Sequence, residues 1–336
     1  NDWLQVGKLD LKGFQTDGSK LRDPLSLDVD FSMDGVTQRM GWAQVSINDV
    51  NFGHYLILES IDNNFLNSRF GTNDGPLYKC QASLRWEGWN VTNYQNTSAY
   101  VPKTNEAEDI SGWEALRDLL AVINFTPPTL LPDKLEPIFD VDLFIRTFVF
   151  EVATGQWDGL RDSNNYYLFQ NPGDGLWKFI RHDMDAAFGA LPAFVPVGTN
   201  DIYTWADGPK AGSGRLLYDR ILSVDKYKLA YTLYMQELFN GFFDPQDFTA
   251  LWRRAMSFQT MNTLPVKQDY PGYFDCGYTY ETYKLSWDQT IVKPVTWYGK
   301  AQIITAVKQW IEARKISGEY YMEQYFDSII ANSTLA

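Results

Sequence analysis

Apolar residues recur along the chain with two different spacings, and the spacing predicts the secondary structure. Alternating apolar and polar residues predict strands at residues 9–12, 42–47, 55–58 and 76–80, and the second and third of these form a hairpin. Apolar residues at every third or fourth position are typical of helices. Helices are expected at residues 19–29, 63–69, 106–123, 138–152, 215–238, 245–261 and 301–316.

The predicted strands gather early in the chain and most of the helices follow them, which indicates an α+β protein. Hydrophobic residues make up 45% of the 336 residues, so the chain can bury a large core. No internal repeat or low-complexity linker divides it. We therefore expect one domain over residues 1–336, with a small antiparallel-sheet part at 1–105 and a larger, mainly helical part at 106–336.

A further predicted hairpin carries polar side chains at its open end. Its strands are residues 166–169 and 177–180, and the Asn-Pro-Gly-Asp-Gly sequence at 171–175 forms the turn. Folding this hairpin brings the residues before its first strand close to those after its second. The polar residues gathered in this way are Asp158, Asn164, Asn165, Asp183 and Asp185.

Carboxylate and amide oxygens of this kind suit Mg²⁺ or Mn²⁺. Asp and Asn are also common in solvated turns, and the Asp-Ser-Asn-Asn sequence at 162–165 is open to that interpretation. Asp183 and Asp185 directly follow an apolar strand, where placing like charges costs free energy unless a cation or hydrogen bonds compensate. We expect the whole set to form a metal site.

The order of these residues resembles the core of protein kinases. A catalytic Asp is followed there by a metal-binding Asn, and an Asp that holds Mg²⁺ comes later in the chain. In the kinase motif the Asn lies five residues after the Asp. Here Asn164 and Asn165 lie six and seven residues after Asp158, and the chain has neither a His-Arg-Asp motif nor a glycine-rich phosphate loop.

Several blocks of the sequence resemble the CotH kinase family, which is named for a bacterial spore-coat protein and also occurs on fungal cell surfaces. They are residues 11–29, which begin Leu-Lys-Gly-Phe, residues 47–79, which contain Arg69-Phe70-Gly71, and residues 158–189. The Trp-Ile-Glu-Ala-Arg sequence at 310–314 also fits the family. Together these blocks span most of the chain.

The resemblance implies an atypical protein-kinase-like fold with two lobes, a small antiparallel sheet lobe and a larger helical lobe. It also implies ATP and Mg²⁺ (or Mn²⁺) as cofactors, and Ser or Thr residues of secreted or surface proteins as substrates. By position, Asp158 corresponds to the catalytic Asp, Asn165 or Asn164 to the amide ligand, and Asp183 and Asp185 to the metal acids. His182 stands where the family usually has Trp, which puts nucleotide preference in doubt.

Candidates for contact with the nucleotide are spread over the first part of the chain. Lys12 projects from the first predicted strand, and Lys79 from a later one. Arg22, at the start of a predicted helix, is placed to reach a phosphate or a carboxylate, as kinase helices do. Glu59 ends the hairpin where a kinase's interlobe connection would lie. For Glu59 and Lys79 a structural ion pair or ordinary surface charge is the alternative, and for Lys12 it is an exposed strand lysine.

Charge argues against two classes of partner. The formal net charge is −13, so nucleic acid and anionic membranes are not expected to bind, because both require basic patches. No apolar run approaches the roughly 20 residues of a transmembrane helix. The chain begins at Asn1 without Met, and we expect a mature or excised part of a secretory precursor.

Four Asn-x-Ser/Thr sequons fit a secreted or cell-surface location, although such triplets also arise by chance. They lie at Asn90, Asn96, Asn124 and Asn332. The two cysteines, Cys80 and Cys276, either form one disulfide or remain buried thiols.

Two other functions fit part of the pattern. One is a surface adhesin or scaffold module, catalytically weak or inactive, with a structural divalent ion such as Ca²⁺ in the acidic site. The other is a metal-dependent hydrolase. That class normally uses His ligands or a His base, and His54 and His182 are the only histidines of the chain.

Overall fold

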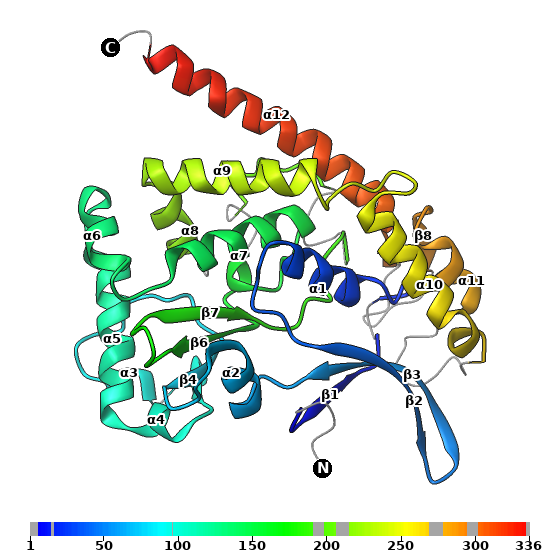
Figure 1. Ribbon diagram of the computed structural model, residues 1–336, viewed down its shortest axis with the longest axis horizontal. Coiled ribbons are helices and arrows are strands. Elements are labelled where there is room, and N and C mark those ends of the chain that lie inside the picture. Colours follow the sequence, from blue (N-terminus) through cyan, green and yellow to red (C-terminus); the bar gives the residue numbers. More distant parts are fainter. Residues whose placement is uncertain are drawn as a thin grey trace.

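The computed structural model describes residues 6–14, 17–95, 97–190, 198–205, 215–268, 278–293 and 302–333. In this part of the chain the protein is a mixed α and β structure with small antiparallel sheets (Figure 1). The α+β class expected from the sequence is therefore confirmed, whereas the two-lobed, kinase-like arrangement stays a prediction.

The first sheet has three strands in the order β1-β3-β2, where β1 is Leu9–Lys12, β2 is Met40–Ile47 and β3 is Val50–Glu59. Asn48 and Asp49 join β2 to β3 and have φ angles of 50° and 64°. Asn and Asp tolerate this left-handed conformation better than most residues do, and two-residue turns of this hand match the twist of a hairpin. Helix α1, Arg22–Ser32, connects β1 to β2.

The second sheet has the order β5-β4-β6-β7. Strands β4 (Leu77–Cys80) and β5 (Tyr100–Pro102) come from the first third of the chain, and β6 (Tyr166–Gln170) and β7 (Trp177–Arg181) come from the predicted acidic hairpin. All five residues of β7 are buried. This sheet therefore joins strands from both sides of the expected boundary at residue 105.

Helix α7, Val141–Thr154, packs on β7 and on two later helices, α9 (Asp225–Asn240) and α12 (Val307–Ser333). In Figure 1, α12 crosses the end of the molecule beyond α9 and carries the C-terminus away from the sheets. The remaining helices surround this centre. They are α2 (Asn63–Phe70), α3 (Thr92–Gln95), α4 (Asn105–Glu108), α5 (Ile110–Phe125), α6 (Leu131–Leu135), α8 (Arg215–Leu222), α10 (Ala250–Gln268) and α11 (Tyr280–Leu285), with short 3₁₀ turns at Pro128–Leu130 and Leu160–Asp162 and a two-stranded sheet of β8 (Ile291–Lys293) and β9 (Gln302–Ile304).

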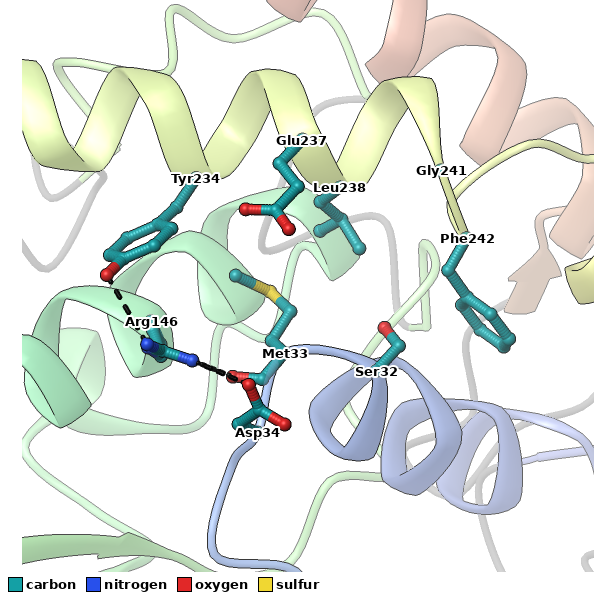
Figure 2. A pocket seen from close by; sticks show the side chains of 9 residues that line it. All are labelled: Ser32, Met33, Asp34, Arg146, Tyr234, Glu237, Leu238, Gly241 and Phe242. Atoms are coloured by element: carbon teal, nitrogen blue, oxygen red, sulfur yellow. Dashed lines mark hydrogen bonds and ion pairs between the residues drawn. The ribbon is translucent and has the colours of Figure 1, made fainter.

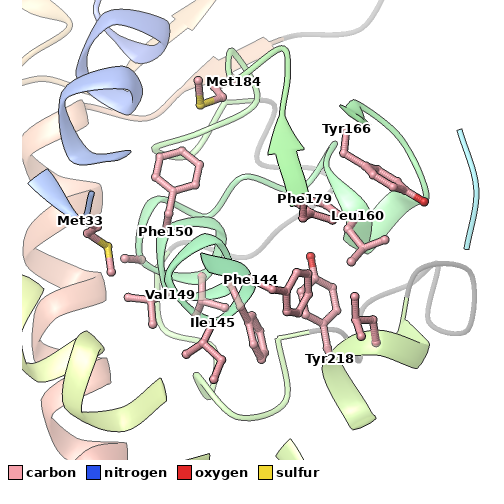
Figure 3. Close-up of a cluster of buried hydrophobic side chains, with 14 of the residues drawn as sticks. Met33, Phe144, Ile145, Val149, Phe150, Leu160, Tyr166, Phe179, Met184 and Tyr218 are labelled. Carbon is pink, nitrogen blue, oxygen red and sulfur yellow. The ribbon is translucent and has the colours of Figure 1, made fainter. Parts of the chain in front are cut away.

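Apolar side chains from most of these elements form one large core. Its centre lies around α7, where Phe144, Ile145 and Val149 pack with Phe179 of β7 and Tyr218 of α8 (Figure 3). A smaller cluster lies under α2 and is formed by Ile61, Phe65, Leu66, Leu77, Tyr167, Phe169 and Ile180. The large core runs from Phe14 to Met322, so α12 is part of the same packed unit as the first helix.

The predicted elements differ from the structure in several segments. The helix expected at 215–238 is two helices, α8 and α9, and residues 302–304 of the helix expected at 301–316 form the strand β9. Residues 86–104, where the sequence pattern predicts no strand or helix, contain α3 and the strand β5. Tyr100 of β5 is paired with Cys80 and is buried, so tertiary pairing makes a strand of a polar segment. The last helix begins at Val307 and extends to Ser333, well beyond the predicted residue 316.

Candidate functional site

Lys12, the last residue of β1, lies among three carboxylates. Its Nζ is 2.5 Å from Oδ1 of Asp183, 2.8 Å from Oδ2 of Asp23 and 4.0 Å from Oδ2 of Asp185. Asp183 and Asp185 follow β7, whereas Asp23 lies in the first turn of α1. One strand, one helix and one loop therefore meet at this ammonium group.

The charges of this cluster shift one another's pKa values. Burial alone would lower the pKa of Lys12, but the carboxylates of Asp23, Asp185 and Asp183 raise it above its usual value. Burial would likewise raise the pKa of Asp183, but Lys12 lowers it. Burial and the neighbouring Asp183 raise the pKa of Asp23 despite the contact with Lys12. Three carboxylates and one ammonium carry a formal charge of −2, which a divalent cation would balance.

Asp158 lies in a loop and is held by the two asparagines. Nδ2 of Asn165 donates to Oδ2 of Asp158 at 3.0 Å and to its main-chain oxygen at 2.9 Å. Nδ2 of Asn164 donates to Oδ1 of Asp158 at 3.1 Å, and Oδ1 of Asn164 accepts from Gln81 at 3.2 Å. Among the described residues, Oδ1 of Asn165 accepts no side-chain or main-chain hydrogen bond. Of the two amides, Asn165 is therefore the one whose oxygen remains for a ligand.

Hydrogen bonds tie the Asp158 loop to the Asp183 segment. The main-chain N–H of His182 donates to the main-chain oxygen of Asn165 at 3.0 Å, and Nε2 of Gln156 donates to the main-chain oxygen of Asp183 at 2.8 Å. Asn165 and Asp183 both have left-handed backbone conformations, with φ angles of 53° and 56°. Such residues concentrate at functional sites, where the surrounding contacts hold them in place.

Buried Glu151 of α7 supports the same loop from below. Its carboxylate accepts hydrogen bonds from Tyr218 of α8 and, at 3.5 Å, from the main-chain N–H of Leu160, two residues after Asp158. Burial raises the pKa of Glu151 to about 7. Hydrogen bonds from the two asparagines and from Leu160 to Glu151 of α7 therefore both hold the loop that carries Asp158.

The donor set fits a hard divalent ion in chemistry, because it offers only oxygens and excess negative charge. Among the described residues, however, no three His, Cys, Asp or Glu side chains form a metal-ligand cluster. Lys12 occupies the position between the carboxylates instead. An ion would therefore draw on Asp183, Asp185 and the amide oxygen of Asn165 rather than on carboxylates alone.

Lys79 and His182 lie beside this cluster. Nζ of Lys79 is 5.9 Å from the ring centre of Tyr167. The ring centres of Tyr167 and His182 are 5.5 Å apart in an edge-to-face arrangement. The positive charge of Lys79 contributes to lowering the pKa of Asp183. Burial lowers the pKa of His182 to about 4, so its imidazole is neutral near pH 7.

Arg22 and Glu59, the other two candidates for contact with a nucleotide, are engaged in buried structural contacts. Arg22 is fully buried and bonds to Asp17 at 2.5 Å and to the main-chain oxygen of Thr305 at 2.7 Å. Glu59 is also buried, and its Oε2 accepts from Arg69 at 2.8 Å and from the main chain of Arg39 at 3.1 Å. Both side chains form ion pairs of the kind that was the alternative for Glu59.

Sequence reasoning missed Asp23 and the face of α1 to which it belongs. Ser26 lies on the same side of the helix, and its Oγ donates to the main-chain oxygen of Met184 at 3.4 Å. One turn later Asp30 forms a buried ion pair with Arg181, the last residue of β7. The sequence does contain a signal for this face. Asp23 and Asp30 are seven positions apart, a spacing that places two acids on the same face of a helix.

The Trp-Ile-Glu-Ala-Arg sequence on α12 packs beneath the site. A side chain at either Gly155 or Gly189 would meet the ring of Trp310, and both glycines have positive φ angles. Arg314 is fully buried, with its guanidinium carbon 5.6 Å from the ring centres of Trp205 and Trp310. Gly155 leads to the Asp158 loop and Gly189 ends the Asp183 segment, so Trp310 supports both.

A cavity of about 160 Å³ lies at the C-terminal end of α1, between α7 and α9 (Figure 2). Arg146 crosses it, bonded to Asp34 at 2.9 Å and to the hydroxyl of Tyr234 at 3.4 Å. None of the residues discussed above lines it. The cavity lies between α1, α7 and α9 and is not part of the acidic cluster.

The other predicted sites have different surroundings. Asn90 is exposed, whereas Asn124 is half-buried and bonded on both sides of its amide. Asn96 and the side chain of Asn332 lie outside the described residues, as does Cys276. Cys80 has a free, buried thiol. Among the described helices, none combines the length and the apolar character needed to cross a bilayer.

Comparison with known proteins places these residues in a family. The family model described as CotH kinase protein matches residues 3–263. Invasin CotH3 of Rhizopus delemar is 26% identical over 249 residues, which cover 69% of this chain and 40% of that protein. The inner spore coat protein H of Bacillus subtilis is 29% identical over 181 residues, or 52% of this chain and 48% of that protein. The chain spans less than half the length of these relatives and belongs to the CotH kinase protein family.

Proposed function

We propose that the protein is an ATP- and Mg²⁺-dependent kinase that phosphorylates Ser or Thr residues of secreted or surface proteins. The observation that carries this proposal is the position of Lys12 between Asp23 of α1 and Asp183. Protein kinases pair a strand lysine with an acidic residue of a nearby helix and place a metal-binding Asp beside them. The pair here uses Asp in place of the usual Glu.

The remaining residues have corresponding roles in this proposal. Asp158, fixed by Asn164 and Asn165, orients the hydroxyl of the substrate and accepts its proton. Asp183, Asp185 and the amide oxygen of Asn165 would hold the metal, which would supply charge neutralisation at the phosphates. Lys12, beside Asp183, would bind the phosphates. Phosphoryl transfer depends on positioning and charge neutralisation, which is what this set offers.

A location on the cell surface or in a coat is part of the proposal. Its support is that the relatives are named as a spore coat protein and as invasins. Acceptor proteins would then be other coat or surface proteins with exposed Ser or Thr residues.

The same observations leave one second candidate, a surface adhesin or scaffold that uses the fold without catalysis. It is favoured by the ion pairs of Lys12, which engage the ammonium group with acids rather than with a phosphate, and by the names of the fungal relatives. In that case a structural divalent ion such as Ca²⁺ would occupy the acidic site without nucleotide.

Two measurements separate the candidates. Thermal unfolding is followed with Mg²⁺ or Ca²⁺ alone and with ATP added, and phosphate incorporation is followed with γ-labelled ATP. The kinase requires a shift in Tm with ATP and Mg²⁺, and incorporation that is lost in Asp158→Ala but kept in Asp327→Ala, an exposed acid of α12. A shift with Ca²⁺ alone, with no nucleotide response, would reject the kinase and support the scaffold.

A further inference from the structure

The sequons at Asn90 and Asn124 have opposite surroundings. Asn90 is exposed, and its Oδ1 accepts the main-chain N–H of Thr92 at 3.1 Å. This bond closes a turn of the Asx type, in which the side-chain oxygen is engaged and the amide nitrogen is left over. Among the described residues, Nδ2 of Asn90 donates to no acceptor, so its nitrogen is available for modification.

Asn124 lies in the last turn of α5 and has no such freedom. Its Nδ2 donates to the main-chain oxygens of Leu120 at 2.7 Å and Leu84 at 3.0 Å, and its Oδ1 accepts from the N–H of Trp86 at 3.1 Å. An amide nitrogen has two hydrogens, and both are used. A sugar on this nitrogen would break one of these bonds and separate the loop of Leu84 and Trp86 from the helix.

We propose that Asn90 carries an N-linked glycan in the folded protein and that Asn124 does not. The donor is an oligosaccharide linked to a polyprenyl diphosphate. A bond forms between Nδ2 of Asn90 and C1 of the first N-acetylglucosamine, while the bond from C1 to the diphosphate oxygen breaks. The diphosphate carrier leaves with the bonding electrons, and the amide nitrogen loses one proton.

Aromatic side chains next to Asn90 give the first sugar a surface to cover. Trp89 is 70% exposed and Phe125 is 61% exposed, and their ring centres lie 4.8 Å and 5.3 Å from that of Trp86. An exposed group of large aromatic rings usually marks a contact surface. Trp89 directly precedes Asn90, so a sugar attached to Asn90 lies next to these rings. We expect this sugar to cover them.

The experiment uses the chain expressed with a secretory leader in a eukaryotic host. Occupancy of each sequon is measured by peptide mass spectrometry after enzymatic deglycosylation in ¹⁸O-water, which labels each formerly modified Asn. Thr92→Ala and Thr126→Ala each remove one sequon and keep its Asn side chain. Labelling at Asn90, lost in Thr92→Ala and unchanged in Thr126→Ala, is expected. An unmodified Asn90, or a glycan on Asn124 of the folded protein, would overturn the proposal.

The role of the aromatic surface has its own readout. Removal of the glycan should lower the Tm of the wild-type protein but leave the Tm of Trp89→Ala unchanged, because the contact is then already absent. An equal loss in both proteins would show that the sugar does not use these rings. Neither result depends on whether the chain transfers phosphate.

Discussion

Arg181 and Asp30 form an ion pair that is almost completely buried, with 5% and 2% of their side chains exposed. Arg181 ends β7 two residues before Asp183, and Asp30 lies two turns after Asp23 on α1. The pair therefore fixes the helix that carries Asp23 to the strand that delivers Asp183. Any movement of α1 relative to β7 would change the position of Asp23 beside Lys12.

Asp30→Asn should destabilise the fold by about 3–5 kcal/mol, because it leaves the charge of Arg181 buried without its partner. The free energy of unfolding in urea measures this loss. Replacing both residues, with Asp30→Leu and Arg181→Met, should restore most of it, since no unpaired charge remains. Asp28→Asn is the matched control on the same helix. It removes a more exposed pair with Arg254 and should cost less than about 1 kcal/mol.

Lys12→Met should abolish the shift in Tm that ATP and Mg²⁺ produce, if the proposed function is right. The ammonium group would then be missing where the phosphates bind, and the three acids around it would repel them. Lys79→Met removes a charge at the edge of the same region, above Tyr167, and should weaken the response without abolishing it. A nucleotide response of normal size in Lys12→Met would remove this residue from the proposed mechanism.

Glu151 should make the stability of the protein depend on pH. Its pKa is raised by burial from 4.5 to about 7, so between these values the folded state holds a proton that the unfolded chain has lost. Stability therefore falls as the pH rises from about 4.5 to about 7, by about 3 kcal/mol in all. Glu151→Gln should remove this part of the slope, measured by urea unfolding at a series of pH values. Glu323→Gln, exposed on α12, should leave the slope as it is.

Gly155→Ala should be more destabilising than Gly175→Ala. Both glycines have positive φ angles, 68° and 76°, so an added Cβ strains the backbone at each by about 1 kcal/mol. Only at Gly155 does that Cβ also meet the ring of Trp310, which adds about 1–3 kcal/mol for overpacking. Equal losses of stability in thermal or urea unfolding would mean that the ring of Trp310 moves aside without destabilising the fold.

Local signals were enough to predict the hairpin at the centre of the site. The turn Asn171 to Gly175 is formed by residues with the required backbone freedom, and the apolar runs beside it form β6 and β7 with the expected pairing. The juxtaposition of Asn165 with the residues after β7 then follows from strand pairing alone. This is why the Asp158 loop and Asp183 were found together in the sequence.

Contacts between distant segments were beyond the same reasoning. Asp23 and Lys12 are eleven residues apart, but they meet only because α1 folds back over β1, and nothing in the spacing fixes that angle. The choice between Asn164 and Asn165 depends on Gln81, which occupies the oxygen of Asn164 from another part of the chain. The partner of Glu59 could not be named for a similar reason, since Arg69 comes from the next helix.

Trp310 also bears on where the protein can be cut. The stretch shared with the family model stops at residue 263, yet the indole that closes over Gly155 and Gly189 lies 47 positions further on. A shortened version that follows the boundary of the family match would expose an apolar hollow directly under the two acidic loops. Shortened versions of the protein should therefore retain the part of α12 that carries Trp310, although the boundary of the family match leaves it out.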